Sequence, residues 1–471
     1  MSLFRVRIWV TGGALLAGCT VMPPDSRMGE AGDAPGRWTA TREARAGIDD
    51  RWVDRFGSRG LGRLVEEAYG SNRDLRAAAA RVERSAALAR GAGAAARPQV
   101  NAALDASRRK QNFIGLPIGG GGGVLSSISE SYGASLNVSW EPDLWGKIRA
   151  GEQAALADLQ AQGWSYHAAR ASLAAQVVRA WLLLAESNEQ IRLAREALKV
   201  RNDTADLVRG RFELAVGEAA GSASQLRLAE TDVATAEAAL AQREGERDQA
   251  QRQLEVLLGR YPSAELAGSA DLPGVPPVPP SGLPSELLLR RPDILVAERR
   301  LAAAGRRVDE ARLAFYPSFP LTASAGSTTS ELRSIFDSDF GVWSIAGRVA
   351  QPILTGGQLS SQLEARGAEE KEAVASLQQT VLGAFGEVET ALAAERFLAE
   401  REASISEALE FARDGASSAE RDFSIGAGDV LTLLAAQNRR IDLASQQLTL
   451  RRLRLDNRVN LHLALGGDYR L

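Results

Sequence analysis

The sequence predicts a mainly α-helical protein that also carries transmembrane β-strands and is built from two internal repeats. Three observations predict this fold class. The stretch 143–216 has no proline and carries an apolar residue at every seventh position; segments of about ten residues alternate between apolar and polar side chains; and the same order of segments occurs twice. The seven-residue seam consists of Val177, Leu184, Ile191, Leu198, Ala205 and Phe212.

The stretch 143–216 is predicted to be a single helix, bounded by Pro142 and Gly217. A seven-residue repeat held over this length indicates a helix supercoiled against its neighbours, because a straight helix would drift off the seam. At about 1.5 Å per residue the helix would be roughly 110 Å long. Such a rod is typical of a protein that spans a distance.

Composition narrows the class of protein. The 471 residues are 45% hydrophobic and only 6% aromatic, so small aliphatic side chains supply most of the apolar surface. This favours closely packed helices over one large globular core. The net charge of −3 gives no electrostatic basis for binding nucleic acid, and no such partner is expected.

The N-terminus is typical of an exported lipoprotein. Two arginines precede a short apolar run, and Leu-Ala-Gly leads directly to Cys19, the one cysteine of the chain. These features predict a signal peptide at 1–18, and they resemble the bacterial lipoprotein box, in which Cys19 would carry the lipid. A signal peptide that happens to contain a cysteine is the alternative. By resemblance to lipoprotein sorting, Thr20 in place of Asp is expected to permit export to the outer membrane. One acyl chain holds a protein weakly and several hold it well, so the anchor need not supply all of the membrane binding.

The predicted segments follow in chain order. A lipidated arm and equatorial segment at 19–71, with one short helix, precedes the first repeat at 72–259, and a proline-rich equatorial linker at 260–290 separates it from the second repeat at 291–465 and the tail at 466–471. The first repeat consists of a helix ending before Pro98, a β-hairpin at 99–140, the long helix at 143–216 and a return helix at 224–258. The second consists of a helix, a β-hairpin at 318–350, a long helix at 353–425 and a return helix at 429–465.

The two repeats align at offsets of 219 for the first helix and strand, 210 for the proline before the long helix, and 207 for the end of the return helix. One detail departs from this match, because the last strand alternates one residue out of phase with its counterpart. A β-bulge in that strand is expected. Within each repeat the two shorter helices would stack end to end beside the long helix, so that arm, linker and tail meet at a middle level.

The four strands have the length of transmembrane β-strands. Four strands cannot close, and lipid does not tolerate open sheet edges, so several chains are needed for a barrel. Two copies would give eight strands and three would give twelve. The alternative is two soluble hairpins that cap a coiled coil.

Motifs before the first long helix, after the linker and before the second long helix resemble those of one family. They are Trp140-Glu141-Pro142-Asp143-Leu144-Trp145-Gly146, Leu289-Arg290-Arg291-Pro292-Asp293-Ile294, and Gln351-Pro352-Ile353-Leu354 with Gly356-Gly357. The resemblance is to the TolC-type outer-membrane efflux channels, most closely the lipid-anchored NodT-like or OprM-like branch. It covers nearly the whole mature chain, in order and in both repeats.

The resemblance implies a homotrimer in which a 12-stranded β-barrel, four strands per chain, continues into a long α-helical barrel. It implies an outer-membrane lipoprotein that extends into the periplasm, docks onto a periplasmic adaptor (membrane fusion) protein and an inner-membrane pump, expected to be of the RND type, and passively conducts drugs or other small molecules outward. No catalytic residue, metal or cofactor is expected beyond the covalent lipid on Cys19.

The resemblance also implies roles for the two turns at the far end of the long helices. Val216 and Gly217 at the first turn, and Gly426 and Gly428 at the second, are the candidates for contact with the adaptor. The second turn matches the family pattern without gaps. The first departs from it, with about four more residues before its return helix.

Asp429 and Thr432 are the candidates for a pore constriction near the second turn. The family often narrows the tunnel here with acidic rings, and three carboxylates around one axis repel each other and favour cations. Because Ala435 and Thr432 occupy positions where members carry Asp, a weaker or differently built constriction is expected. The alternative role for Asp429 is a helix N-cap.

The remaining patterns indicate no chemistry. His167 and His462 have no partner motif, and Arg451-Arg452 is interpreted as part of a solvated helix face. Two other functions share features of this prediction. A type I protein secretion channel would share the whole architecture, because fold does not determine cargo; a non-conducting coiled-coil envelope lipoprotein would share the helices and the anchor.

Overall fold

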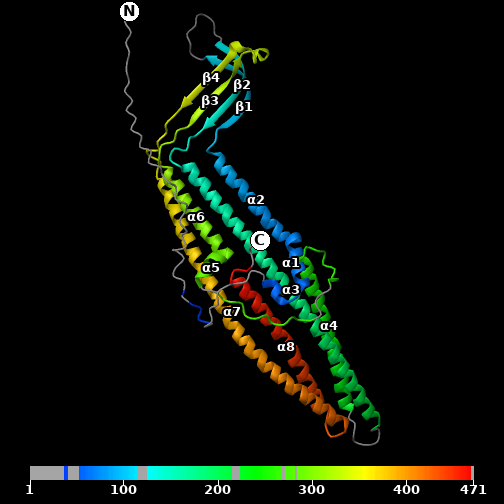
Figure 1. The fold of residues 1–471 in the computed structure, drawn as a ribbon. Helices are drawn as coiled ribbons and strands as arrows, with labels where there is room; N and C mark the ends of the chain where they lie inside the picture. The colour runs from blue at the N-terminus through cyan, green and yellow to red at the C-terminus, as the bar shows by residue number, and fades with distance from the viewer. Residues whose placement is uncertain are drawn as a thin grey trace, which may run out of the picture.

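The computed structural model describes residues 35, 37–40, 52–113, 125–214, 223–266, 271–281 and 284–467. The molecule is elongated, with the strands at one end and two helical turns at the other (Figure 1). The α-helices are α1 (Arg59–Ser71), α2 (Arg73–Ala94), α3 (Lys147–Leu214), α4 (Ala223–Leu257), α5 (Pro284–Arg290), α6 (Pro292–Leu313), α7 (Gln358–Ser424) and α8 (Val430–Ala464). The strands are β1 (Gln99–Phe113), β2 (Leu125–Trp140), β3 (Leu321–Thr329) and β4 (Gly341–Gly347), and short 3-10 helices occupy Trp52–Phe56, Leu332–Ser334 and Ser338–Phe340.

The helices form a wall one layer thick. In the half next to the strands they lie side by side in the order α2, α3, α6, α7, and in the other half in the order α4, α3, α8, α7 (Figure 1). The long helices α3 and α7 run through both halves, whereas α4 lies below α2 and α8 lies below α6 (Figure 1). The predicted end-to-end stacking of the shorter helices is therefore present in both repeats.

The two repeats match helix by helix. α2 and α6 have 22 residues each and begin at Arg73 and Pro292, 219 positions apart. α4 and α8 have 35 residues each, and their first residues are 207 positions apart. α3 and α7 have 68 and 67 residues and begin at Lys147 and Gln358, 211 positions apart. The offset drops from 211 to 207 across the turn, so the first turn is four residues longer than the second.

α3 begins four residues later than predicted because the chain turns before it. Gly146 has φ +85°, in the left-handed region that favours glycine. The Asp143 carboxylate accepts hydrogen bonds from the backbone N–H groups of Ile148 (3.1 Å) and Arg149 (2.8 Å). Asp143 therefore satisfies free amides at the start of the helix instead of joining it.

The arm holds more helix than the single short one that the sequence predicts. A 3-10 helix at Trp52–Phe56 precedes the 13-residue α1, whose N-cap Ser58 accepts a hydrogen bond from the N–H of Leu61 (3.3 Å). α1 buries a narrow stripe formed by Leu61, Val65 and Ala68, and a stripe this narrow gives a weak period in the sequence. The predicted linker likewise contains the short helix α5.

The strands form one antiparallel sheet in the order β1-β2-β3-β4. The pairing of β3 with β4 is continuous from Leu321–Gly347 to Ser327–Gly341, and an isolated bridge joins Ser318 to Ala350 in the same register. The expected bulge is therefore wrong for the described part of this hairpin. The one-residue difference in phase lies after β4, where α7 begins six residues past Pro352 and α3 begins five residues past Pro142.

α3 lies at the centre of the wall. Its middle part packs against α1, the end of α4 and α8, and buries Trp181, Leu182 and Leu184. By length and composition α3 is apolar enough to cross a membrane, but 61% of its apolar window is buried within the protein. The apolar character of α3 is that of a core helix.

Candidate functional site

The two faces of the sheet differ in polarity. Within the register, Val100, Val138, Ala323 and Ile345 form one row across the four strands, and Ala102, Leu136, Ala325 and Trp343 form the next row on the same face. Trp343 and Ile345 are 77% and 79% exposed. The opposite face carries a polar row of Asn101, Asn137, Ser324 and Ser344, in which the two serine hydroxyls lie 2.8 Å apart. One face suits lipid and the other suits water.

The sheet joins the helices through indole hydrogen bonds. Trp145 Nε1 donates to the carbonyl of Pro317 (2.7 Å), and its ring lies 5.4 Å from that of Tyr316. Trp140 Nε1 donates to the carbonyl of Ala96 (3.0 Å). The tryptophans of the motif before α3 therefore attach the first hairpin to the turns that precede β1 and β3.

At the middle level, each repeat has the same joint between stacked helices. Asn72, before α2, donates from Nδ2 to the carbonyl of Leu257 at the end of α4 (2.9 Å). Arg291, before α6, donates from Nη1 to the carbonyl of Ala464 at the end of α8 (3.0 Å). Asn72 and Arg291 are 219 apart and their acceptors 207 apart, so the two bonds occupy equivalent positions. Both satisfy carbonyls that a helix end leaves free.

Arg291 also explains part of the motif after the linker. Its guanidinium forms ion pairs with Asp293 (2.7 Å) and with Glu387 of α7 (2.7 Å), and the residue is buried. It therefore connects α6, α7 and α8 at one point, and in the first repeat the neutral Asn72 takes its place.

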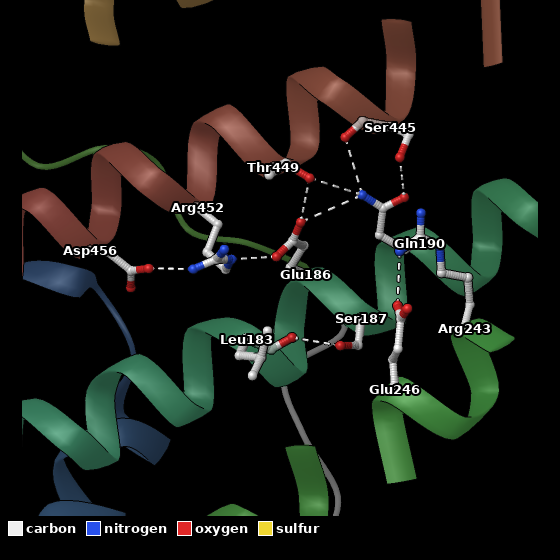
Figure 2. Close-up of polar contacts among 10 residues, drawn as sticks. All are labelled: Leu183, Glu186, Ser187, Gln190, Arg243, Glu246, Ser445, Thr449, Arg452 and Asp456. Carbon is white, nitrogen blue, oxygen red and sulfur yellow. Dashed lines mark hydrogen bonds and ion pairs between the residues drawn. The ribbon is translucent and has the colours of Figure 1, made fainter. Parts of the chain in front are cut away.

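A ladder of polar contacts joins α3 to α8 (Figure 2). Glu186 of α3 accepts hydrogen bonds from Thr449 Oγ1 (2.8 Å) and Arg452 of α8, and Arg452 also pairs with Asp456. Burial raises the pKa of Asp456, against the lowering effect of Arg452. One turn further along α3, Gln190 exchanges hydrogen bonds with Ser445 of α8 (2.9 and 3.1 Å).

The ladder continues along the seam in both directions. Arg179 contacts Asn460, Arg440 pairs with Glu196 (2.9 Å), and Gln437 donates to Thr204 Oγ1 (3.3 Å). The interpretation of Arg451-Arg452 as a solvated face is wrong. Arg452 pairs with buried Glu186, and Arg451 donates to the carbonyls of Leu272 and Pro273 in the linker.

α8 is attached to α7 by a second set of charges. Glu395 Oε1 of α7 accepts hydrogen bonds from Arg454 (2.6 Å) and Arg458 (2.9 Å), and Arg454 also pairs with Glu402 (2.6 Å). Arg458 is only 1% exposed. α8 is thus bound on both sides by charged groups, which define its register against α3 and α7.

At the second turn, the ends of the two long helices meet. The guanidinium of Arg211 in α3 lies 4.0 Å from the centre of the Phe423 ring in α7 and donates to the Phe423 carbonyl. The cation therefore contacts both the aromatic face and the negative end of the α7 dipole. Gly426 has φ +80°, and a side chain at Gly428 would meet the backbone N of Phe423 at 3.1 Å, so both positions suit glycine.

Asp429 and Thr432 are in direct contact. Asp429 is the N-cap of α8: Oδ1 accepts from the backbone N–H of Thr432 (3.0 Å) and Oδ2 from its hydroxyl (2.8 Å). These hydrogen bonds hold the pKa of Asp429 below its ordinary value, so the side chain is ionised at neutral pH. The carboxylate is exposed, and capping leaves its charge available to a pore.

Comparison with known proteins identifies the family. The profile of the family described as outer membrane efflux protein matches residues 64–260 and 283–467, most of the chain. The chain belongs to this family. OpmQ, the pyoverdine export outer membrane protein of Pseudomonas putida, is 34% identical to it, over 97% of this chain and 96% of OpmQ. SilC, a probable outer membrane lipoprotein of Salmonella typhimurium, is 29% identical over 97% of each chain.

The fold of this efflux protein agrees with the same family. The outer-membrane channel OprN superposes with a TM-score of 0.83 at 28% identity, over 93% of this chain and 97% of that one. The predicted TolC-type family and the outer-membrane channel role are confirmed.

The predicted site residues of the efflux protein divide into two groups. Asp429, Thr432, Gly426 and Gly428 lie together at the turn between α7 and α8, whereas Cys19, Val216 and Gly217 lie outside the described residues. Within the described part of the chain, no group of three or more His, Cys, Asp or Glu could hold a metal ion. Adaptor contact and pore constriction stay predictions.

The charged contacts of α8 were not predicted from the sequence. Arg454 and Arg458 are spaced by four residues, which places them on one helix face. That spacing is equally typical of a solvated face. The partners Glu395 and Glu186 lie on two other helices, so tertiary packing determines which charges are buried.

Proposed function

We propose that three copies of the chain close into a twelve-stranded outer-membrane barrel continued by a tunnel of helices across the periplasm, a passive conduit for drugs or other small molecules. The observation that carries the proposal is the open sheet, which has an exposed apolar face and two edges, β1 and β4, that pair with no further strand among the described residues. Lipid tolerates such a sheet only when its edges are paired, and a second and third copy offer matching edges.

Three further parts of the system are proposed with it. The turns around Gly217 and Gly428 dock onto a periplasmic adaptor protein, which couples the channel to an inner-membrane pump of the RND type. A lipid on Cys19 adds to the hold of the barrel on the membrane. Small-molecule cargo is supported by OpmQ, whose name gives pyoverdine export as its role.

Purified protein in a planar lipid bilayer tests the conduit. We expect discrete single-channel currents, because the polar face of the sheet would line a water-filled barrel. The absence of ionic conductance would instead favour the coiled-coil scaffold. A strain lacking the protein is expected to become more sensitive to drugs; unchanged drug sensitivity with loss of a secreted protein would favour the type I secretion channel.

A further inference from the structure

An aromatic side chain on α7, Phe397, is exposed, and its ring is contacted by the guanidinium of the neighbouring Arg396, 4.7 Å from the ring centre. α7 contacts α8 through Glu395 and Glu402, but Phe397, two residues after Glu395, is 57% exposed. Because two residues correspond to about 200° around a helix, Phe397 lies on the side of α7 that faces away from α8. α7 is the last helix at its edge of the wall (Figure 1).

The helix at the opposite edge has an unexplained glycine. Gly245 lies in the interior of α4, and a Cβ added there would meet no atom within 4 Å. The backbone at this position is ordinary helix and needs no glycine. A glycine has no side chain, so the surface of α4 at Gly245 leaves room for a bulky side chain of a neighbouring helix to approach closely.

The internal repeat relates these two residues to a contact already present in the chain. Phe397 of α7 is the repeat equivalent of Glu186 of α3, at the offset of 211. Gly245 of α4 is the repeat equivalent of Arg452 of α8, at the offset of 207. Glu186 and Arg452 form the ion pair at the centre of the seam between α3 and α8 (Figure 2).

We propose that Phe397 of one copy packs onto Gly245 of the next copy, at the place that the Glu186–Arg452 pair occupies within each copy. The inference rests on the proposed assembly of copies edge to edge. The contact would define how far α7 of one copy is shifted along α4 of the next. Three such contacts form in a closed trimer, one at each junction between α7 and α4.

The two seams carry different chemistry, and the difference specifies which helices pair. An aromatic ring against a glycine buries apolar surface without any charge to match, whereas the seam within the chain is ionic. If α7 were to take the place of α3 beside α8, Phe397 would stand where Glu186 meets Arg452, and the half-buried guanidinium would lose one of its two carboxylate partners. Such mismatched charges exclude wrong pairings of similar helices.

A thiol cross-link between copies tests the register. A chain with Phe397→Cys and Gly245→Cys, treated with a short bifunctional maleimide in detergent, is expected to run as a covalently linked trimer on denaturing gels. The matched control is Phe397→Cys with Thr231→Cys, an exposed position on the same helix two heptads or about 21 Å away. The control pair is expected to stay monomeric, and each single substitution controls for reaction through Cys19. Linkage of the control pair in place of the first would overturn the proposed register.

A charge exchange tests the energetics. Phe397→Glu is expected to reduce the trimer, measured as mass in detergent, because a carboxylate then faces the glycine of the next copy without a partner. Adding Gly245→Arg recreates between copies the ion pair of Figure 2, and we expect it to restore the trimer. Gly70→Leu, at an exposed helix position where a Cβ meets nothing within 4 Å, controls for bulk added to an open glycine.

The outcomes separate this proposal from the assembly on which it rests. If the unmodified protein is not trimeric in detergent, the proposed assembly fails. If the unmodified protein is trimeric but Phe397→Glu leaves its mass unchanged, or Gly245→Arg does not rescue that variant, the Phe397–Gly245 contact is wrong and the assembly stands.

Discussion

At the residue scale, short-range contacts hold together the turn between α7 and α8. Asp429 caps α8 through Thr432, Gly426 supplies the left-handed backbone, and Arg211 reaches across from α3 to the Phe423 carbonyl and ring. Each contact satisfies a group that a helix end leaves exposed. These contacts can be removed singly, which makes the turn suitable for substitution.

Asp429→Asn separates the cap from the charge, because Asn is as good an N-cap as Asp but is neutral. If Asp429 forms part of a constriction, Asp429→Asn lowers the cation preference of single-channel currents while hydrogen exchange at Thr432 stays slow. Asp429→Ala speeds that exchange as well. Unchanged conductance and selectivity in Asp429→Asn would leave the residue only its capping role.

The cap has a defined pH dependence. Its carboxylate has a pKa below the ordinary value because it accepts hydrogen bonds from Thr432. A lowered pKa means that the contribution of the cap is present at neutral pH and is lost as the pH falls through that pKa. The protection of the Thr432 amide, measured as its exchange rate relative to the intrinsic rate at the same pH, should therefore fall only in acid below the ordinary pKa range of Asp, and Asp429→Asn should abolish this dependence.

Arg211→Ala is expected to loosen the ends of α3 and α7 by about 1 kcal/mol, since it removes a cation–π contact and a hydrogen bond to a helix end. The measurement is hydrogen exchange of the amides around Gly426. Arg211→Lys keeps the charge but loses the planar contact with Phe423. The exchange rate in this variant should therefore lie between those of the unmodified protein and Arg211→Ala. Equal exchange in all three proteins would contradict a role for Arg211 in holding the turn.

At the element scale, the joints between stacked helices are the points where the repeats agree most closely. Gly259 follows α4 with φ +71°, and Gly466 follows α8 with φ +104°. A Cβ at Gly259 would lie 2.5 Å from the carbonyl oxygen of Ser71, and one at Gly466 would lie 3.1 Å from the Cβ of Arg290. Equivalent residues therefore limit both glycines, namely the last residues of α1 and α5, which directly precede the stacked helices α2 and α6.

Gly259→Ala is expected to lower the melting temperature more than Gly57→Ala does. Both replacements force a positive φ on alanine, which costs about 1–2 kcal/mol. Gly57 has φ +70° with nothing within 4 Å of a new Cβ, whereas Gly259 adds a clash with the backbone of Ser71. Thermal unfolding followed by circular dichroism gives the comparison, and equal melting temperatures would show that the joint can shift at no cost.

The arm contacts α7 through the ring of Trp38, which packs against Phe385, and through the carboxylate of Glu389. Glu389 accepts hydrogen bonds from the backbone N–H groups of Thr39 (2.6 Å) and Ala40 (2.8 Å). Burial opposes the charge of Glu389, but these N–H groups hold its pKa below the ordinary value. Glu389→Ala should therefore release the arm at neutral pH, detected as faster tryptic cleavage after Arg37; an unchanged rate would mean that buried Trp38 alone holds it.

At the scale of the whole molecule, the repeat suggests how copies join. The edges β1 and β4 stand in the same relation to each other as β3 and β2, which pair within the chain. The sheet ends at β1 and β4, and the wall of helices ends at α4 and α7. The repeat equivalents of these edges, β3 with β2 and α8 with α3, are in contact with each other within the chain.

In the proposed assembly, the strand register between copies is expected to follow that relation. Ala134 of β2 pairs with Ser327 of β3. The repeat equivalent of Ala134 is Ile345 of β4, 211 positions later, and that of Ser327 is Arg108 of β1, 219 positions earlier. Ile345 of one copy is therefore expected to lie opposite Arg108 of the next. A disulfide between Ile345→Cys and Arg108→Cys is expected to link copies, since paired strands bring Cα atoms within about 5.5 Å. Ile345→Cys with Val100→Cys, eight residues or about 26 Å away along β1, is the control and should not link.

The sequence predicts the elements well where one physical signal dominates. The heptad seam through Val177 and Phe212 predicts α3, and alternation predicts the strands. It fails for the bulge in β4. The alternation around Trp343 shows that this strand and its repeat differ by one residue in phase, but it does not show whether that difference lies within the strand or after it. It also fails for Arg452, because the spacing of charged residues along a helix is the same whether the side chain faces water or pairs with Glu186.

The duplication, the long helices, the strands and the family motifs can therefore all be predicted from the sequence, because each depends on spacing along one chain. Packing in three dimensions was needed to show that Arg291 and Asn72 form equivalent joints, that α8 lies between two charged seams, and that Phe397 and Gly245 lie on helices at opposite edges of the wall. Each of these depends on distances between helices far apart in the chain, which packing establishes and periodicity does not encode.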